Sequence, residues 1–145
     1  MANGLLLGQD AQVAAWVHST YRLFPMKYDM AVGIVSPEKI LLGAFLLEHY
    51  NGVDVHLSYY GPGTPSLAIG RSIARIVALE LNAARCTVVT SKRNKRLISK
   101  LLKFGFKLEG SQKRFYGHTD NARNTAIRLV MFREEINRWA GIKRC

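Results

Sequence analysis

The spacing of apolar residues along this 145-residue chain changes at Gly61. Before Gly61, three apolar runs are separated by short polar segments, and the Asn51-Gly52 pair between the last two is a strong hairpin signal. These runs are Met30–Val35, Ile40–Tyr50 and Val53–Tyr60. Beyond Gly61, apolar side chains recur at the spacing of one helical face: Ile69, Ile73, Ile76 and Val77. The sequence therefore predicts an antiparallel meander followed by a helix.

The helix after Gly61 has a start signal of its own. Thr64 is placed as its N-cap and Pro65 as its first residue, where a missing N–H costs nothing. We expect this helix to run from Thr64 to about Asn82.

Further elements are predicted on both sides of this region. A helix over 10–24 begins at Asp10, which is suited to cap it. Another helix starts after Asn94 as N-cap and stops at Gly105, and its apolar stripe is Leu97, Ile98, Leu101 and Leu102. The remaining elements are a strand at Cys86–Thr90, strands at Phe106–Tyr116 and Thr125–Phe132, and a helical turn or two at Glu134–Ala140.

The resulting order is β, α, three antiparallel strands, α, β, α and two strands. A strand that returns through a helix to another strand forms a right-handed crossover with parallel pairing. We therefore expect an α/β fold with a mixed, mostly antiparallel twisted sheet of about six to seven strands and helices on both faces. No linker or internal repeat divides the sequence, so residues 1–145 are expected to form a single domain.

Net charge indicates the kind of partner. The chain has 21 Lys and Arg against 10 Asp and Glu, a net charge of +11. The segment Lys92–Lys107 contains basic residues and no acidic ones. Such a surface favours nucleic acid, phosphorylated cofactors or acidic proteins, although a basic solvated surface without a partner is about equally compatible with the charge alone.

Two other features limit the function classes. The cysteines, Cys86 and Cys145, form neither a disulfide framework nor, with the histidines, a zinc-binding spacing. The longest apolar stretch, Ile40–Leu47, is too short to cross a bilayer, which takes about 20 residues. The first residues lack a secretory signal. We therefore expect no metal site, no membrane contact and a cytoplasmic protein.

The junction from Tyr59 to Leu67 could bind a phosphate group. A strand ends there, a Gly-Pro-Gly turn follows and a helix begins, so that free backbone N–H groups and the positive end of the helix dipole converge. A turn of this kind before a helix is also common without any ligand. The dinucleotide fingerprint and the P-loop lysine are both missing.

The segment Asn94–Gly110 resembles the signature of the GNAT acetyltransferases. In that family an Asn opens the fourth helix, and a Lys-x-Gly-Phe-x-x-Glu-Gly pattern, which matches Lys103–Gly110, joins it to the sixth strand. Thr125–Arg133 resembles the seventh strand, and the predicted element order is similar to the family's over nearly the whole chain. The Gly-Phe-Lys-Leu-Glu-Gly form is closer to the ribosomal-protein and small-amine branch than to the histone branch, and small phage-borne members are also similar.

The resemblance implies a GNAT-like fold and acetyl-CoA as acyl donor. In GNAT proteins the turn before the helix holds the pyrophosphate of acetyl-CoA, and the preceding strand, here Val53–Tyr60, pairs with the pantetheine arm. The residues expected at the cofactor are Leu57, Ser58, Tyr59, Gly61, Gly63, Thr64, Ser66, Leu67 and Asn94.

The turn departs from the usual family pattern of Gln or Arg, two residues, Gly, one residue, and Gly or Ala. One register places Ala68-Ile69-Gly70 on the small residues with Pro65 at the Gln or Arg position, and the other uses Gly61–Ser66. The first register buries the turn inside the predicted helix, so we prefer the second.

The usual general acid of the family is missing. Many members have a Tyr four residues before the Gly of the Gly-Phe pair, and this position is Leu101 here. Holding thioester and amine in attack geometry contributes roughly 7–11 kcal/mol, against roughly 3–5 kcal/mol for one acid or base. Positioning is the larger effect, and the branch that this chain resembles often lacks the Tyr, so we still expect activity.

His56 is the first candidate for a general base, because it titrates near neutrality and lies about where family members place water-linked bases. A hydrogen-bonded structural histidine is the alternative. Along its strand, the residues expected to share one face are Asp54, His56, Ser58 and Tyr60.

Two further side chains are candidates for proton transfer. Glu48, next to His49, ranks below His56 and is alternatively a solvated strand-end charge. Tyr116, at the end of the predicted sixth strand, is a substitute acid or a packing aromatic. Cys86 is expected to be an inert core thiol.

These features predict an acetyl-CoA dependent N-acetyltransferase in which a primary amine attacks the thioester directly in a ternary complex. The charge suggests an amine carried by an acidic or nucleic-acid-associated macromolecule. The alternative is a catalytically inactive GNAT-fold module whose basic surface binds nucleic acid or an acidic protein. Both a monomer and a homodimer are compatible with the sequence.

Overall fold

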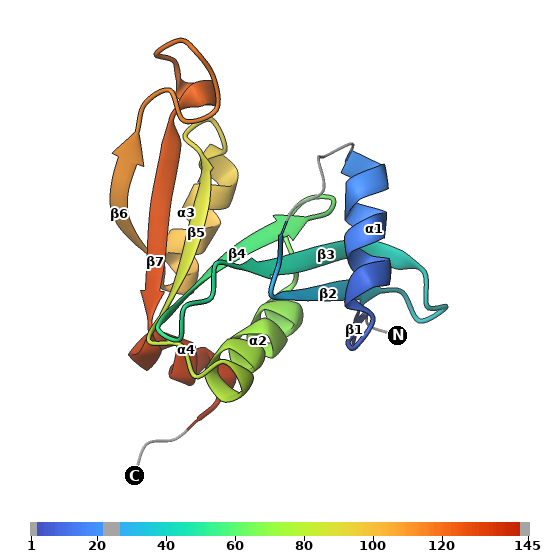
Figure 1. Ribbon diagram of the computed structural model, residues 1–145. Helices are drawn as coiled ribbons and strands as arrows, with labels where there is room; N and C mark the ends of the chain where they lie inside the picture. Colours follow the sequence, from blue (N-terminus) through green and yellow to red (C-terminus); the bar gives the residue numbers. More distant parts are fainter. Residues whose placement is uncertain (1–2, 22–26, 143–145) are drawn as a thin grey trace.

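The computed structural model describes residues 3–21 and 27–142, so the predicted helical residues 22–24 and Cys145 lie outside it. The described strands form one seven-stranded sheet in the order β1-β2-β3-β4-β5-β7-β6 (Figure 1). In chain order the elements are β1 (Gly4–Leu6), α1 (Asp10–Tyr21), β2 (Met30–Val35), β3 (Leu41–Glu48), β4 (Asp54–Tyr60), α2 (Leu67–Arg75), η1 (Ile76–Glu80), β5 (Arg85–Ser91), α3 (Lys95–Phe104), β6 (Lys107–Gln112), η2 (Ala122–Asn124), β7 (Ala126–Phe132) and α4 (Arg133–Ala140).

The sheet is mixed, as predicted. β4 and β5 are parallel, and the other neighbouring strands in the described part of the chain are antiparallel. Because a hairpin cannot join parallel neighbours, the chain returns from β4 to β5 through α2 and η1. The predicted α/β class, the mostly antiparallel sheet and the order of its elements are confirmed.

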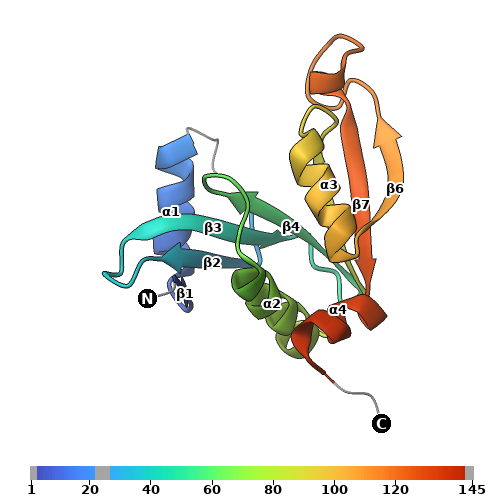
Figure 2. The same cartoon turned by 180° about the vertical axis from the view of Figure 1, so that it is seen from behind.

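The two faces of the sheet carry different helices (Figure 2). On one face Val13 and Val17 of α1 pack against Ala31, Ala44 and Leu46. On the other face α2, α3 and α4 cover a larger core that includes Leu47, Val55 and Leu129. The neighbours Leu46 and Leu47 thus face opposite layers, as alternation along a strand requires.

β4 and β5 stay together over a short distance only. Their pairs are Asp54–Arg85, Val55–Cys86 and His56–Thr87. Beyond these pairs β4 remains bonded to β3 as far as Tyr60, and β5 remains bonded to β7 as far as Ser91. The sheet is therefore split between β4 and β5, and the divergence of the two strands is visible in Figure 1. The facing edges of the split have no partner strand in the described chain.

The helix after β4 begins later than predicted. Its N-cap is Ser66, whose Oγ accepts a hydrogen bond from the Ile69 backbone N–H at 3.3 Å, and Leu67 is the first helical residue. The prediction of Thr64 as cap was wrong, because either hydroxyl satisfies the capping rule and the Thr64 hydroxyl binds Lys100 instead. The helix continues as a wider π turn, η1, to Glu80.

Two other predicted caps have different roles. Asp10 is the first residue of α1, and its Oδ2 accepts a hydrogen bond from the Ala31 backbone N–H at 2.9 Å, which ties the helix to β2. Asn94 occupies the N-cap position of α3, but its side-chain amide donates to Thr90 Oγ1 at 2.8 Å. The predicted stop of α3 at Gly105 is confirmed by its left-handed φ of 114°.

The meander is confirmed with a longer connection than a two-residue hairpin. The loop between β3 and β4 is organised by Asn51, whose Oδ1 accepts hydrogen bonds from the backbone N–H groups of Val53 and Asp54. Gly52 has a φ of 90°, which favours glycine.

The predicted strand at Phe106–Tyr116 ends early. β6 stops at Gln112, and Tyr116 lies in the following loop, where its N–H donates to the Asn124 carbonyl at 3.1 Å. The strand prediction was wrong for residues 113–116, because Arg114 has a φ of 55° and turns the chain out of the extended conformation.

No helix of the described ranges combines the length and apolar composition needed to cross a membrane.

The contact between Gly70 and Phe104 generates a stability prediction. A Cβ at Gly70 would lie 2.9 Å from the tip of the Phe104 ring, and that ring is stacked on Trp139 with the centroids 3.7 Å apart. Gly70→Val is therefore expected to lower the free energy of unfolding by about 1–3 kcal/mol, measured by urea titration. Ala68→Val, at an exposed position of the same helix, is the control and should change it by about 0.5 kcal/mol at most. Equal losses in the two variants would mean that the contact with Phe104 does not set the cost.

Candidate active site

A cavity of about 380 Å³ lies on the sheet face that α2, α3 and α4 cover. Its wall is mainly apolar and includes Leu57 of β4, Ile73 of α2, Leu101 of α3 and Trp139 of α4. It also reaches Thr64, Pro65 and Ser66, so the cavity extends to the loop before α2. An elongated, largely apolar group with a polar end would fit this space.

The loop at the cavity has a conformation that needs glycine. Gly63 has a φ of 64°, and a Cβ there would meet open space, so the backbone rather than packing excludes other residues. A Cβ at Gly61 would collide with the hydroxyl of Tyr59. This hydroxyl donates a hydrogen bond to the Pro62 carbonyl at 3.3 Å, and Tyr59 thereby holds the loop against the end of β4.

The residues predicted at a cofactor are distributed around this cavity. Leu57, Thr64, Ser66 and Leu67 line it, while Ser58 and Tyr59 belong to the part of β4 that has separated from β5. Gly61 and Gly63 form the adjoining loop. Ala68, Ile69 and Gly70 are helical, so the alternative register would place the turn within α2. Asn94 does not line the cavity.

The split between β4 and β5 lies beside the cavity, which Leu57 of β4 and Cys86 of β5 both line. Leu57 faces the cavity, whereas Glu48, His56, Ser58 and Tyr60 share the other face, as the β3–β4 register shows. The predicted grouping of alternate β4 residues is confirmed. A group bound in the cavity and a group bound beside His56 could therefore meet through the split.

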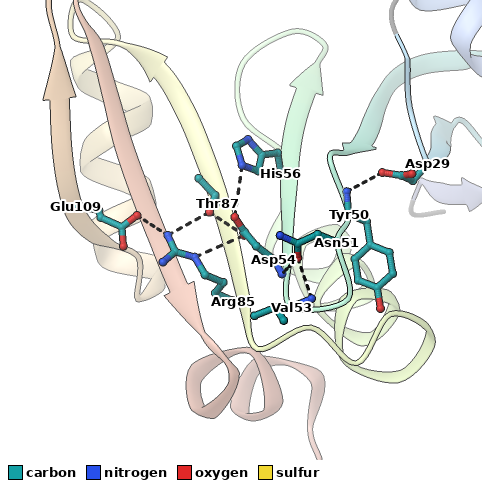
Figure 3. Close-up of polar contacts among 9 residues, drawn as sticks. All are labelled: Asp29, Tyr50, Asn51, Val53, Asp54, His56, Arg85, Thr87 and Glu109. Atoms are coloured by element: carbon teal, nitrogen blue, oxygen red, sulfur yellow. Dashed lines mark hydrogen bonds and ion pairs between the residues drawn. The ribbon is translucent and has the colours of Figure 1, made fainter.

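His56 is held by Asp54, with 3.4 Å between Nε2 and Oδ2 (Figure 3). Burial lowers the pKa of His56; Asp54 opposes this effect, and His49 and Arg128 add to it. The net shift is downward from 6.5, so the imidazole is neutral near pH 7 and able to accept a proton.

A polar network fixes the apex of the split, where β4 and β5 last pair (Figure 3). The Arg85 guanidinium donates to Glu109 of β6 and to Thr87 Oγ1, and it lies 3.6 Å from Asp54 Oδ1. The Thr87 hydroxyl donates to the same Asp54 oxygen at 2.9 Å. The hydrogen bond from Arg85 lowers the pKa of Glu109. Asp54 is thereby fixed in place to orient His56.

Glu48 and Tyr116, the other predicted proton-transfer residues, lie on the His56 side of the split. Glu48 pairs with His56 across β3 and β4, and its buried Oε1 has no hydrogen-bond partner in the described chain. The pKa of Tyr60 is raised by burial first, then by Glu48 and also by Tyr116, so Glu48 and Tyr116 are each within electrostatic reach of Tyr60. Burial also raises the pKa of Tyr116.

Several cavity residues were missed in the sequence. Lys100 and Lys103 of α3 line the cavity, as do Phe104 and Trp139. Phe104 follows Leu97 and Leu101 at helical spacing, which was a usable signal. No sequence pattern placed Trp139, which is far from α3 in the chain and donates to the Phe104 carbonyl through its indole N–H.

Cys86 is 3% exposed, and burial raises the pKa of its thiol to about 12, which confirms an inert core thiol. Within residues 3–21 and 27–142, no group of three or more His, Cys, Asp or Glu side chains is placed to hold a metal ion.

At the level of sequence, the chain matches no protein-family model and no curated protein. Its structure is similar to solved acetyltransferases. A chimeric spermidine N-acetyltransferase from Vibrio cholerae and hSSAT superposes with a TM-score of 0.73 at 14% identity, over 94% of this chain and 99% of that chain. The Vibrio cholerae spermidine N-acetyltransferase in complex with CoA and spermine gives 0.70 at 12% identity, over 92% and 97% of the two chains.

A GNAT-family acetyltransferase from Bacillus anthracis gives a TM-score of 0.59 at 14% identity, over 72% of this chain and 66% of that chain. These likenesses confirm the expected fold: the chain has the fold of the GNAT acetyltransferases. The ribosomal-protein branch and the similarity to phage-borne members stay predictions.

The lowered pKa of His56 generates a prediction about pH. The unfolded chain takes up the His56 proton near pH 6.5 and the folded chain only at lower pH, so stability should fall as the pH drops below about 6.5. In His56→Asn, the free energy of unfolding should change less between about pH 7.5 and about pH 5.5 than in the wild type, measured by urea titration. His18→Asn, at an exposed position of α1, should retain the wild-type change. An unaltered pH dependence of the free energy of unfolding in His56→Asn would contradict the lowered pKa of His56.

Proposed function

We propose that this protein is an N-acetyltransferase that transfers an acetyl group from acetyl-CoA to a primary amine within a ternary complex. The observation that carries the proposal is the split between β4 and β5, which lies between the cavity beside α2 and the face that carries His56. A donor on one side and an acceptor on the other can react only through such an opening.

The residues of the donor side fit CoA. The apolar wall suits the pantetheine arm, whose amide groups can hydrogen bond to the edge of β4 at residues 57–59, which have separated from β5. The pyrophosphate would lie at the loop Gly61–Ser66, where the first turn of α2 presents backbone N–H groups. The complex of a structurally similar enzyme with CoA supports this assignment.

His56 is the proposed general base. The amine nitrogen forms a bond to the acyl carbon, the bond from that carbon to sulfur breaks, and the proton lost by the amine goes to His56 directly or through water. A neutral imidazole oriented by Asp54 is suited to this step. Glu48 is the alternative base, and Tyr116 is the proposed donor of a proton to the departing thiolate.

Leu101 lines the cavity at the position of the usual Tyr acid, so the chain supplies no acid from α3 at this position. Catalysis would then depend mainly on positioning, which can contribute roughly 7–11 kcal/mol. The fixed apex around Arg85 supports this because it limits relative movement of β4 and β5.

We further propose that the amine belongs to an acidic or nucleic-acid-associated macromolecule. Spermidine and spermine are the acceptors that the names of the similar enzymes suggest. A net charge of +11, however, repels free polyamines and attracts polyanions. A cytoplasmic location and a monomer or homodimer belong to the same proposal, and no observation favours an inactive binding module.

Donor binding is the first test. Acetyl-CoA at millimolar concentration is expected to raise the melting temperature, because it binds only the folded state. Gly63→Val should abolish this shift by distorting the loop. Gly52→Val is the matched control, because Gly52 also has a positive φ and open space but lies in the β3–β4 loop. It should lose stability without losing the shift. Absence of any shift in the wild type would remove the donor from the proposal.

Catalysis is the second test, with spermidine, lysine-containing peptides and peptides with a free N-terminus as trial acceptors and thiol release as the readout. With any accepted amine, His56→Gln should lower kcat by about 10²–10⁴-fold and remove the acidic limb of its pH profile. CoA affinity should not change, because His56 lies on the other face from the cavity. His49→Asn, whose ring lies 5.2 Å from His56, should retain the acidic limb and move it to higher pH, because His49 lowers the pKa of His56. A fully active His56→Gln enzyme would transfer the role to Glu48.

A further inference from the structure

The loop that would hold the pyrophosphate is short of positive charge and of hydrogen-bond donors. No Lys or Arg occurs from Gly61 to Gly70, and Pro62 and Pro65 have no N–H to donate. The Ile69 N–H is already bonded to Ser66 Oγ. The next basic residue, Arg71, has its guanidinium over the Trp139 ring, 5.5 Å from the centroid. A dianionic group here needs a cation from another element.

Lys100 of α3 is placed to supply it. Its Nζ donates a hydrogen bond to Thr64 Oγ1 at 2.7 Å, which bridges α3 and the loop. Lys100 and Lys103 are the charged residues of the cavity wall, and no acidic side chain lines the cavity. The Lys100 ammonium therefore has no carboxylate partner at this position in the described residues and retains its charge for an anion.

The packing of α3 explains this placement. Leu97, Leu101 and Phe104 follow one another at helical spacing and line the cavity. Lys100 lies at the edge of that stripe, so its aliphatic stem can follow the wall while its ammonium reaches the loop.

We propose that Lys100 binds the pyrophosphate of the acyl donor and replaces the Gln or Arg that the loop lacks, with Thr64 as a positioning residue for its ammonium. The inference rests on the proposed function. A Lys provides a point charge with three donors, so it can contact a phosphate oxygen while it remains near Thr64. The positive charge thus comes from α3, across the cavity, and not from the loop sequence.

Binding of CoA and of 3′-dephospho-CoA, measured by calorimetry on the full chain, tests this proposal, because both ligands contain the pyrophosphate and only CoA has the 3′-phosphate. Lys100→Met should weaken both ligands by about tenfold or more and make their affinity less dependent on salt. Lys100→Arg should restore most of the affinity. Lys107→Met removes the same charge at an exposed residue of β6 and should bind both ligands as the wild type does.

If Lys100→Met weakens the binding of CoA but not of 3′-dephospho-CoA, Lys100 contacts the 3′-phosphate and the proposal is overturned. Unchanged binding of both ligands by Lys100→Met would also overturn it. Failure of the wild type to bind either ligand would instead overturn the proposed function itself. Melting temperatures of the free variants show whether each is folded.

The role of Thr64 is tested by Thr64→Val, which removes the oxygen that accepts from Lys100. We expect Thr64→Val to lose less binding free energy for CoA than Lys100→Met does. The double variant should lose less than the sum of the two single variants. Strict additivity would mean that Thr64 and Lys100 act independently and would overturn the positioning role.

Discussion

The separation of β4 from β5 after three residue pairs is the constraint on which the rest of the structure depends. Each strand keeps its outer partner, β3 or β7, so the sheet stays continuous on both sides of the split. α2 and α4 pack on one part of the core and α3 on the part next to β6, which leaves the cavity between them. Because α2 follows β4 after a tight turn, its N-terminus lies at the open end of the split.

The apex has to be rigid for the split to keep its shape. Arg85 connects three strands there, because it contacts Asp54 of β4 and Glu109 of β6 while it belongs to β5. Below the apex, the Tyr50 hydroxyl donates to the Leu81 carbonyl at 2.5 Å and ties the β3–β4 loop to the end of η1. These contacts fix Asp54, and Asp54 in turn orients His56. Stability and the proposed chemistry therefore share the same side chains.

Local patterns predicted the elements well where one rule acted alone. The period change at Gly61, the stop at Gly105 and the β4 alternation were all confirmed. They failed where two residues satisfied the same rule, as with Thr64 and Ser66, both hydroxyl residues suited to an N-cap. The strand prediction also failed at Tyr116, because the spacing of apolar and polar residues does not reveal the turn at Arg114.

The sequence by itself determined most of the strand and helix segments, their order, and which residues of β4 share a face, because these follow from the spacing of neighbouring residues. Only the tertiary structure decided that Arg85 meets Glu109, that Lys100 reaches Thr64 and that Trp139 closes the cavity over Phe104. Such contacts depend on the order β5-β7-β6 and on the packing angles of helices far apart in the chain. The spacing of residues within one segment cannot predict these contacts, because each depends on how all the helices and strands pack together.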